Sequence, residues 1–206
     1  MSAPDSTDRM TSRLEMVAAI ILGLATVASA WGAYQATRWS GVQATAYTEA
    51  GLASTEAAKA YQLADSKLNL DQTLFVEWAV AVSQGDEELA DYIDLSLFSP
   101  ELGAAVDAWE ESDETPTPFD TDAYVIEELD IAEEWEAESA EQNRAGRDAN
   151  QTADNYVLLT VILTSALFFA GISTVLRSVR VRYALLGLGG ALLVGATIVM
   201  LTFPIE

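Results

Sequence analysis

Two uncharged apolar segments near the C-terminus, separated only by a short basic bridge, constrain the fold more than any other feature of this sequence. The segments are residues 156–176 and 183–203, and the bridge is residues 177–182. Each segment has about 21 residues, so at about 1.5 Å per helical residue it reaches roughly 31 Å, the thickness of a bilayer's hydrocarbon core. Because the bridge is so short, we predict two antiparallel transmembrane helices joined by a tight turn.

Three arginines, Arg177, Arg180 and Arg182, lie in this bridge. Basic residues that flank membrane spans stay in the cytoplasm. We therefore predict a multi-pass protein of the cytoplasmic (inner) membrane, with the bridge on the cytoplasmic side.

A third apolar run, residues 14–34, follows Arg9 and Arg13. This pattern has two readings. It is typical of a first span with a cytoplasmic N-terminus, and also of a signal peptide cleaved after Ala28-Ser29-Ala30. We adopt the first span because the spacing of small residues continues through the supposed cleavage point.

Three spans divide the chain into alternating compartments. The predicted order is 1–13 cytoplasmic N-terminal tail, 14–34 first span, 35–155 acidic extracytoplasmic helical domain, 156–176 second span, 177–182 cytoplasmic turn, 183–203 third span and 204–206 external C-terminus.

The charge of the chain is concentrated in the predicted external domain. The net charge is -22, and residues 35–155 contain 28 Asp and Glu against 5 Lys and Arg. Such a surface repels phosphate backbones, which argues against nucleic acid as a partner. The chain has no His and no Cys, so it lacks the commonest general base and the commonest zinc ligands. We expect no enzyme activity and no cofactor.

Helix-forming residues continue without proline from the first span to about Ser83, which predicts one helix of roughly 65 to 70 residues. Short helices are expected at 87–97 and 102–110, and another long helix from about Ala123 into the second span. The fold class is all-α, with three transmembrane helices. Two of them extend outside the membrane as a long antiparallel helical hairpin of coiled-coil type, capped by the short helices.

One stripe of the second long helix is predicted to face the first. Its members recur at three- and four-residue steps: Val125, Leu129, Ala132, Trp135, Ser139, Gln142, Gly146, Ala149 and Ala153. Aligning Tyr34 with Tyr156 at the membrane exit predicts that Tyr61 lies near Leu129 and Arg38 near Asp154.

Small side chains at four-residue spacing predict helix-packing faces, because they let another helix approach closely in lipid. They are Ala25, Ser29, Ala33, Thr37, Gly41 and Thr45 after the N-terminus, and Gly187, Ala191 and Gly195 in the third span. These faces serve either self-association or packing within one chain.

Asp130, Glu134 and Glu138 form an acidic row on one helical line. Like charges at this spacing cost roughly 0.2 to 0.5 kcal/mol per pair. Three readings remain open: a solvated acidic face, a partner surface, or a weak site for divalent cations. No calcium-loop pattern accompanies the row.

A polar cluster is predicted just outside the membrane, formed by Arg38, Gln43, Arg144, Arg147 and Asp154. These side chains either satisfy one another and lock the hairpin register, or form a site for a ligand or a lipid headgroup.

The block Trp-Gly-Ala-Tyr-Gln-Ala-Thr-Arg-Trp-Ser-Gly-Val-Gln-Ala at 31–44 is the most specific motif. Together with Phe75-Val-Glu-Trp78, Ala105-Val-Asp-Ala-Trp109, Asn155-Tyr156 and 167–173, it makes the chain resemble an uncharacterised family of bacterial three-span membrane proteins. The resemblance implies three spans and an external helical domain, and it implies no activity, cofactor or catalytic residue. The chain departs from the family in its greater external acidity, which a saline habitat would explain.

Three functions are compatible with these features. The first, which we favour, is a non-catalytic membrane scaffold or accessory subunit that associates with itself or with another membrane protein. The second is an oligomeric cation channel with the acidic domain at its mouth. The third is an enzyme based on carboxylates, although no carboxylate pair stands out.

Overall fold

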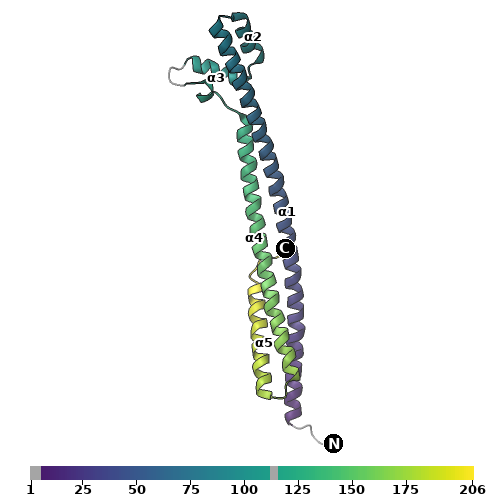
Figure 1. Ribbon diagram of the computed structural model, residues 1–206. Helices are drawn as coiled ribbons and strands as arrows, with labels where there is room; N and C mark the ends of the chain where they lie inside the picture. The colour runs from purple at the N-terminus through teal and green to yellow at the C-terminus, as the bar shows by residue number, and fades with distance from the viewer. Residues whose placement is uncertain (1–5, 112–115) are drawn as a thin grey trace. The chain divides into compact units, whose positions relative to one another are not determined.

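The computed structural model describes residues 6–111 and 116–206, with side chains described from residue 12 onward in these ranges. Its elements are α1 (Ser6–Gln84), α2 (Glu87–Leu97), α3 (Pro100–Glu110), the short 3-10 helix η1 (Pro118–Asp120), α4 (Glu127–Val175) and α5 (Val179–Met200) (Figure 1). All of these elements are helical, which confirms the all-α class. Three helices, α1, α4 and α5, are long and apolar enough to cross a membrane, as expected of a multi-pass membrane protein.

Local chemistry sets several helix ends where the sequence predicts them. After α1, Gly85 adopts φ +74°, a left-handed conformation that ends helices and favours glycine. The Asp86 carboxylate then accepts a hydrogen bond from the Leu89 backbone N–H at 3.2 Å, which caps α2. Ser99 caps α3 in the same way, with Pro100 at the first helical position.

Other helix ends differ from the prediction. The predicted tail is partly helical, because α1 already begins at Ser6. Helix α4 begins at Glu127 rather than near Ala123. In the segment before it, the Tyr124 hydroxyl is tied to Asp71 by a 3.0 Å hydrogen bond. Helix α5 begins at Val179, so the connection after α4 is shorter than the predicted bridge.

The chain divides into two compact units, which are described separately. Unit 1 contains the chain up to Thr48 and from Asn143 to Glu206, and unit 2 contains Glu49–Gln142. Unit 1 therefore holds the beginning of α1, most of α4 and the whole of α5. Unit 2 holds the end of α1, the beginning of α4 and the short helices between them.

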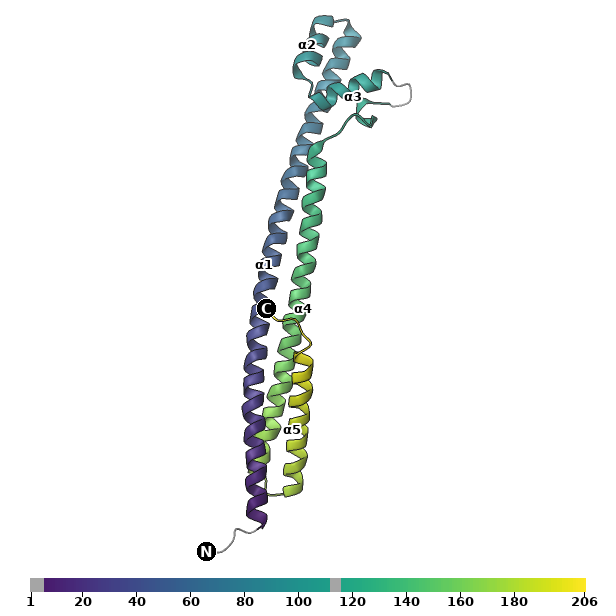
Figure 2. The same ribbon diagram turned by 180° about the vertical axis from the view of Figure 1, so that it is seen from behind.

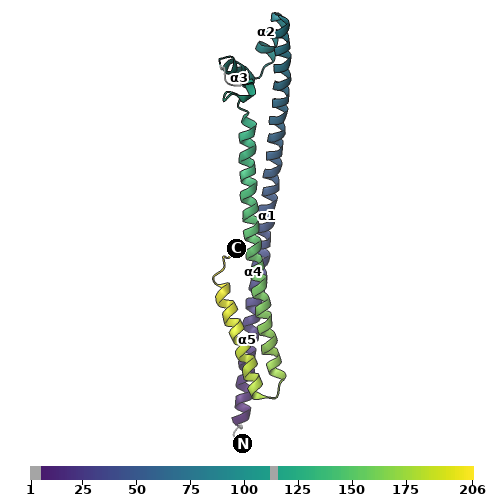
Figure 3. The ribbon, with the colours of Figure 1, turned by 60° about the vertical axis from the view of Figure 1, so that its left-hand side comes forward.

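In unit 1 the three apolar helical segments lie side by side (Figures 2 and 3). Their buried positions alternate between four- and three-residue steps: Leu14, Ala18, Ile21 and Ala25 in α1, Leu159, Leu163, Ala166 and Ala170 in α4, and Arg182, Leu186, Gly189, Leu193, Ala196 and Met200 in α5. This seven-residue period keeps one face of each helix inward when helices cross at about 20°. In lipid, such contacts stabilise through van der Waals packing.

Two glycines allow the closest approaches in unit 1. A Cβ atom at Gly189 would lie 3.1 Å from the Ala166 carbonyl oxygen, and one at Gly32 would lie 2.8 Å from the Thr160 Oγ1 atom. Either contact is tighter than ordinary van der Waals distance. These two positions therefore bring α5 and α1 against α4.

In unit 2 the inner face of α1 between residues 50 and 64 consists of alanines. The buried residues Ala50, Ala53, Ala57, Ala60 and Ala64 repeat at the same three- and four-residue steps. Because these side chains are small, α4 approaches closely enough for the Ser139 hydroxyl to donate a 3.0 Å hydrogen bond to the Ala50 carbonyl oxygen. Farther along α1, Lys67 contacts Glu128, which precedes Ser139 in α4. Because the contacts move backward along α4 as they move forward along α1, the two helices are antiparallel in this unit.

Tyr61, which is predicted to lie near Leu129, makes its hydrogen bond farther along α4. Its hydroxyl donates a 3.0 Å hydrogen bond to Glu136, about two helical turns from Leu129. Side chains lean toward the N-terminus of their own helix. In an antiparallel pair, a long side chain therefore contacts a residue with a higher number than the residue that its own backbone faces.

Candidate functional site

The most elaborate polar site in unit 1 receives the C-terminal segment. Gln35 is fully buried in α1. Its amide oxygen accepts a hydrogen bond from the Glu206 backbone N–H at 3.1 Å, and its amide nitrogen donates to the Glu206 carbonyl oxygen at 3.4 Å. A side-chain amide offers the same donor and acceptor as a peptide group. Gln35 therefore makes the two hydrogen bonds with Glu206 that a residue of a neighbouring β-strand would make.

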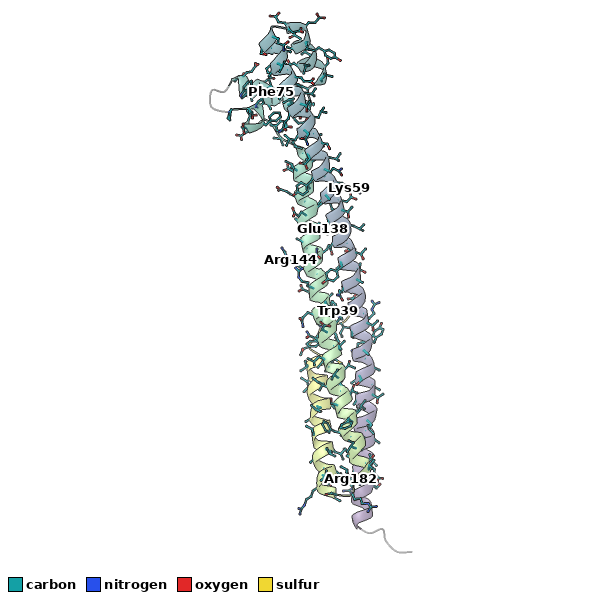
Figure 4. All side chains as sticks on the ribbon, viewed as in Figure 1. Trp39, Lys59, Phe75, Glu138, Arg144 and Arg182 are labelled. Carbon is teal, nitrogen blue, oxygen red and sulfur yellow. The ribbon has the colours of Figure 1, made fainter. Side chains whose placement is uncertain are left out.

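Two aromatic side chains hold the residues before Glu206. The Trp39 Nε1–H and the Tyr156 hydroxyl donate to the same carbonyl oxygen, that of Pro204, at 3.1 and 3.0 Å. The Tyr156 ring also packs edge-on against Phe203, with ring centroids 5.6 Å apart. We call Gln35, Trp39, Tyr156 and residues 203–206 the C-terminal dock. Trp39 is labelled in Figure 4.

Arg38 belongs to the edge of this dock. Its Nη2 atom lies 4.0 Å from the Glu206 Oε1 atom, and both side chains are about half exposed. Asp154, the predicted neighbour of Arg38, accepts a 3.2 Å hydrogen bond from Asn150. An ion pair of this length and exposure contributes little stability, on the order of 0 to 1 kcal/mol.

The other members of the predicted juxtamembrane cluster do not join the dock. Gln43 is half buried, whereas Arg144 and Arg147 are exposed on α4. Arg144 is labelled in Figure 4. The described structure therefore does not show the predicted set as one hydrogen-bonded cluster. The polar contacts of this part of α1 are instead those of Gln35, Arg38 and Trp39 with the C-terminal segment.

At the opposite end of unit 1, Arg182 is the most deeply buried Lys or Arg among the residues whose side chains are described. Its side chain is 7% exposed, and its Nη2 atom lies 3.9 Å from the Glu15 carboxylate (Figure 4). The Nε and Nη2 atoms have no hydrogen-bond partner. Arg177 and Arg180, the other two topology residues, are exposed.

The polar centre of unit 2 is Asp71, a 3% exposed residue of α1. One of its carboxylate oxygens accepts hydrogen bonds from the Ser99 hydroxyl at 2.9 Å and from the Tyr124 hydroxyl at 3.0 Å. Burial, followed by the bond to Asp71, strongly raises the pKa of Tyr124. Asp71 thereby links α1 to the cap of α3 and to the segment before α4.

Aromatic rings pack around this centre. The Phe75 ring meets Trp109 and Phe119 edge-on, each with ring centroids 5.7 Å apart, and stacks near Trp78 at 5.8 Å. Aromatic pairs of this geometry contribute roughly 0.5 to 1.5 kcal/mol each beyond the area they bury. Phe75 is therefore the centre at which α1, α3 and η1 pack together.

An ion-pair network lies beside Asp71. The Lys67 Nζ atom is 2.7 Å from one Glu128 carboxylate oxygen and 3.6 Å from a Glu101 oxygen. The hydrogen bond to Glu128 raises the pKa of Lys67, and the same bond lowers the pKa of Glu128. Both shifts stabilise the charged forms.

The acidic row Asp130, Glu134 and Glu138 is exposed on α4; Glu138 is labelled in Figure 4. Glu138 accepts a hydrogen bond from Gln142 of the same helix at 2.8 Å. Within residues 6–111 and 116–206, no cluster of three or more Asp or Glu side chains is arranged to hold a metal ion. The row therefore lies on an exposed face of α4.

The predicted small-residue faces have different positions. In α1, Ala25 is buried and Ser29 is half buried, but Ala33, Thr37, Gly41 and Thr45 are exposed. A four-residue step exceeds one helical turn by about 40°, so the series winds away from the partner helices. In α5, Gly187, Ala191 and Gly195 are all exposed, and a Cβ atom at either glycine would meet no atom within 4 Å.

Comparison of the chain with protein-family models, with curated proteins and with solved structures finds no match.

Proposed function

We propose that the protein is a non-catalytic scaffold or accessory subunit of the cytoplasmic membrane that associates with itself and presents its acidic helical domain outside. The observation that carries this proposal is the division of α5 into two faces. One face, with Leu186, Gly189 and Leu193, is buried within unit 1. The other carries Gly187, Ala191 and Gly195 and is exposed.

The exposed face has the character of a helix–helix interface in lipid. Small residues four apart let a second helix approach closely, so that backbone atoms make van der Waals contact. The exposed series Ala33, Thr37, Gly41 and Thr45 on α1 begins in the proposed first span and continues beyond it. It offers a second surface where another helix can approach closely. We further propose membership of the bacterial three-span family that the 31–44 block resembles, which has the same three-span organisation.

The hydroxyl groups of the apolar segments also support a structural role. Thr160, Thr164 and Ser165 each donate to a carbonyl oxygen one turn back, at 2.9, 2.6 and 3.0 Å. Hydroxyl donors that are satisfied within their own helix need no water or ion. This favours the scaffold over the oligomeric cation channel.

Cysteine cross-linking tests the self-association directly, because the natural chain has no cysteine. With Ala191→Cys in native membranes, mild oxidation should give a cross-linked dimer. The matched control Leu186→Cys, on the buried face of α5, should remain monomeric. A monomeric Ala191→Cys chain, together with a monomer mass in mild detergent, would show that the exposed face of α5 is not a self-association surface.

A further inference from the structure

An apolar groove lies between α1 and α5 in unit 1. It encloses about 520 Å³ and is lined by Leu24, Val27 and Trp31 of α1, by Val194 and Ile198 of α5, and by Ile205 of the C-terminal segment. The volume falls within the range of roughly 300 to 1,000 Å³ that is typical of small-molecule sites. The groove is thus formed by two apolar helices and is bordered by the docked chain end.

A pair of opposite charges marks one end of this groove. Leu24, Trp31 and Arg38 follow one another at seven-residue intervals, so they share one face of α1, each about 10 Å further along the axis. Glu206 directly follows the lining residue Ile205 and lies 4.0 Å from Arg38. The apolar lining therefore leads to a cation and an anion that stand side by side.

This charge pair is not closed on itself. At 4.0 Å the Arg38 and Glu206 side chains are too far apart for a hydrogen bond, and they are 52% and 41% exposed. Both side chains are therefore accessible from the surroundings. Trp31 is half exposed, and amphipathic rings of this kind sit at the level where lipid headgroups meet hydrocarbon.

We propose that the groove binds one phosphatidylethanolamine molecule, with an acyl chain between α1 and α5 and the headgroup on the Arg38–Glu206 pair. The guanidinium donates to the phosphate oxygens, and the carboxylate accepts from the primary ammonium group. The complementarity is specific to this headgroup class. A trimethylated ammonium cannot donate hydrogen bonds, and a glycerol headgroup brings no cation to Glu206.

The inference rests on one part of the proposed function, the location of α1 and α5 in a bilayer. Incorporation of the full chain into nanodiscs tests that location separately. A chain that stays soluble without detergent or lipid would refute the membrane location, whereas a nanodisc-embedded chain without bound lipid would refute only the lipid site.

Native mass spectrometry of the detergent-solubilised full chain, titrated separately with phosphatidylethanolamine, phosphatidylcholine and phosphatidylglycerol, measures the binding. One phosphatidylethanolamine per chain should be retained about tenfold more tightly than the other two lipids, as expected for one charge-assisted hydrogen bond. Arg38→Gln should remove this preference.

Groove-filling variants provide the matched comparison. Val27→Trp and Ile198→Trp place a large ring in the groove at exposed positions, so helix packing is retained, and both should weaken lipid retention about tenfold. The control Val17→Trp changes an exposed valine of α1 outside the groove and should have no effect. Equal retention of the three lipids, undiminished retention in Val27→Trp, or a lipid-free dimer that occupies the groove would each overturn the proposal.

Discussion

Removing the Asp71 carboxylate should selectively loosen α3 and residues 116–126 in unit 2. In Asp71→Ala, the Ser99 and Tyr124 hydroxyls lose the oxygen that accepts from them at 2.9 and 3.0 Å. A hydrogen bond to a charged group contributes about 1.5 to 3 kcal/mol, and both donors are partly exposed and regain water, so we expect a loss of about 3 kcal/mol. Asp71→Asn keeps one acceptor oxygen and should lose about half as much.

Hydrogen exchange followed by mass spectrometry on the full chain measures this locally, without assuming two-state unfolding. Peptides that cover α3 and residues 116–126 should exchange roughly a hundredfold faster in Asp71→Ala, since 1.4 kcal/mol corresponds to a factor of about ten. Peptides from α5 should be unchanged. The control Asp65→Ala removes an exposed carboxylate of α1 and should leave all peptides within about 0.5 kcal/mol of the natural chain. Equal protection of α3 in Asp71→Ala and Asp65→Ala would refute the role of Asp71.

Three further predictions concern other contacts. The Lys67–Glu128 pair should stabilise unit 2 above pH 4.5, the ordinary pKa of Glu128, and this contribution should vanish as the pH falls through the lowered pKa. Circular dichroism measures the thermal midpoints of the natural chain and of Lys67→Gln, and the difference between them should shrink on acidification. A difference that does not change with pH would contradict a stabilising Lys67–Glu128 pair. Gly32→Ala should destabilise unit 1 by about 1 to 3 kcal/mol, because its Cβ meets Thr160 and Met200, whereas Gly41→Ala, in open space, should be neutral or stabilising. Gln35→Leu should release the C-terminal segment, so that the Glu206 backbone amide exchanges its hydrogen at least about tenfold faster than in Gln43→Leu; equal exchange rates would exclude the dock.

The apolar helices and most helix ends were predictable because each depends on residues close in sequence. Uncharged runs of span length, the Gly85 turn and the Ser99 cap are local signals. The inner stripe of α4 was also readable, since Ala132, Gly146 and Ala149 are buried at steps that match the helical period.

The packing face of α1 and the C-terminal dock were not predictable in the same way. Small residues occur on several sides of α1. The sequence alone does not distinguish the largely exposed series at four-residue steps from the buried series at alternating four- and three-residue steps. Gln35 gives no signal as an isolated polar residue, because its partner Glu206 is 171 positions away. Asp71 was missed for a similar reason: its burial depends on Ser99 and Tyr124, which only the folded unit brings to it.

The orientation of the chain in the membrane is the claim on which the scaffold proposal depends. Single-cysteine variants Ser96→Cys, in the exposed α2, and Ser178→Cys, between α4 and α5, can be labelled in intact cells with a membrane-impermeant maleimide. The account predicts that Ser96→Cys reacts in intact cells and that Ser178→Cys reacts only after permeabilisation. Labelling of Ser178→Cys but not of Ser96→Cys in intact cells would contradict it.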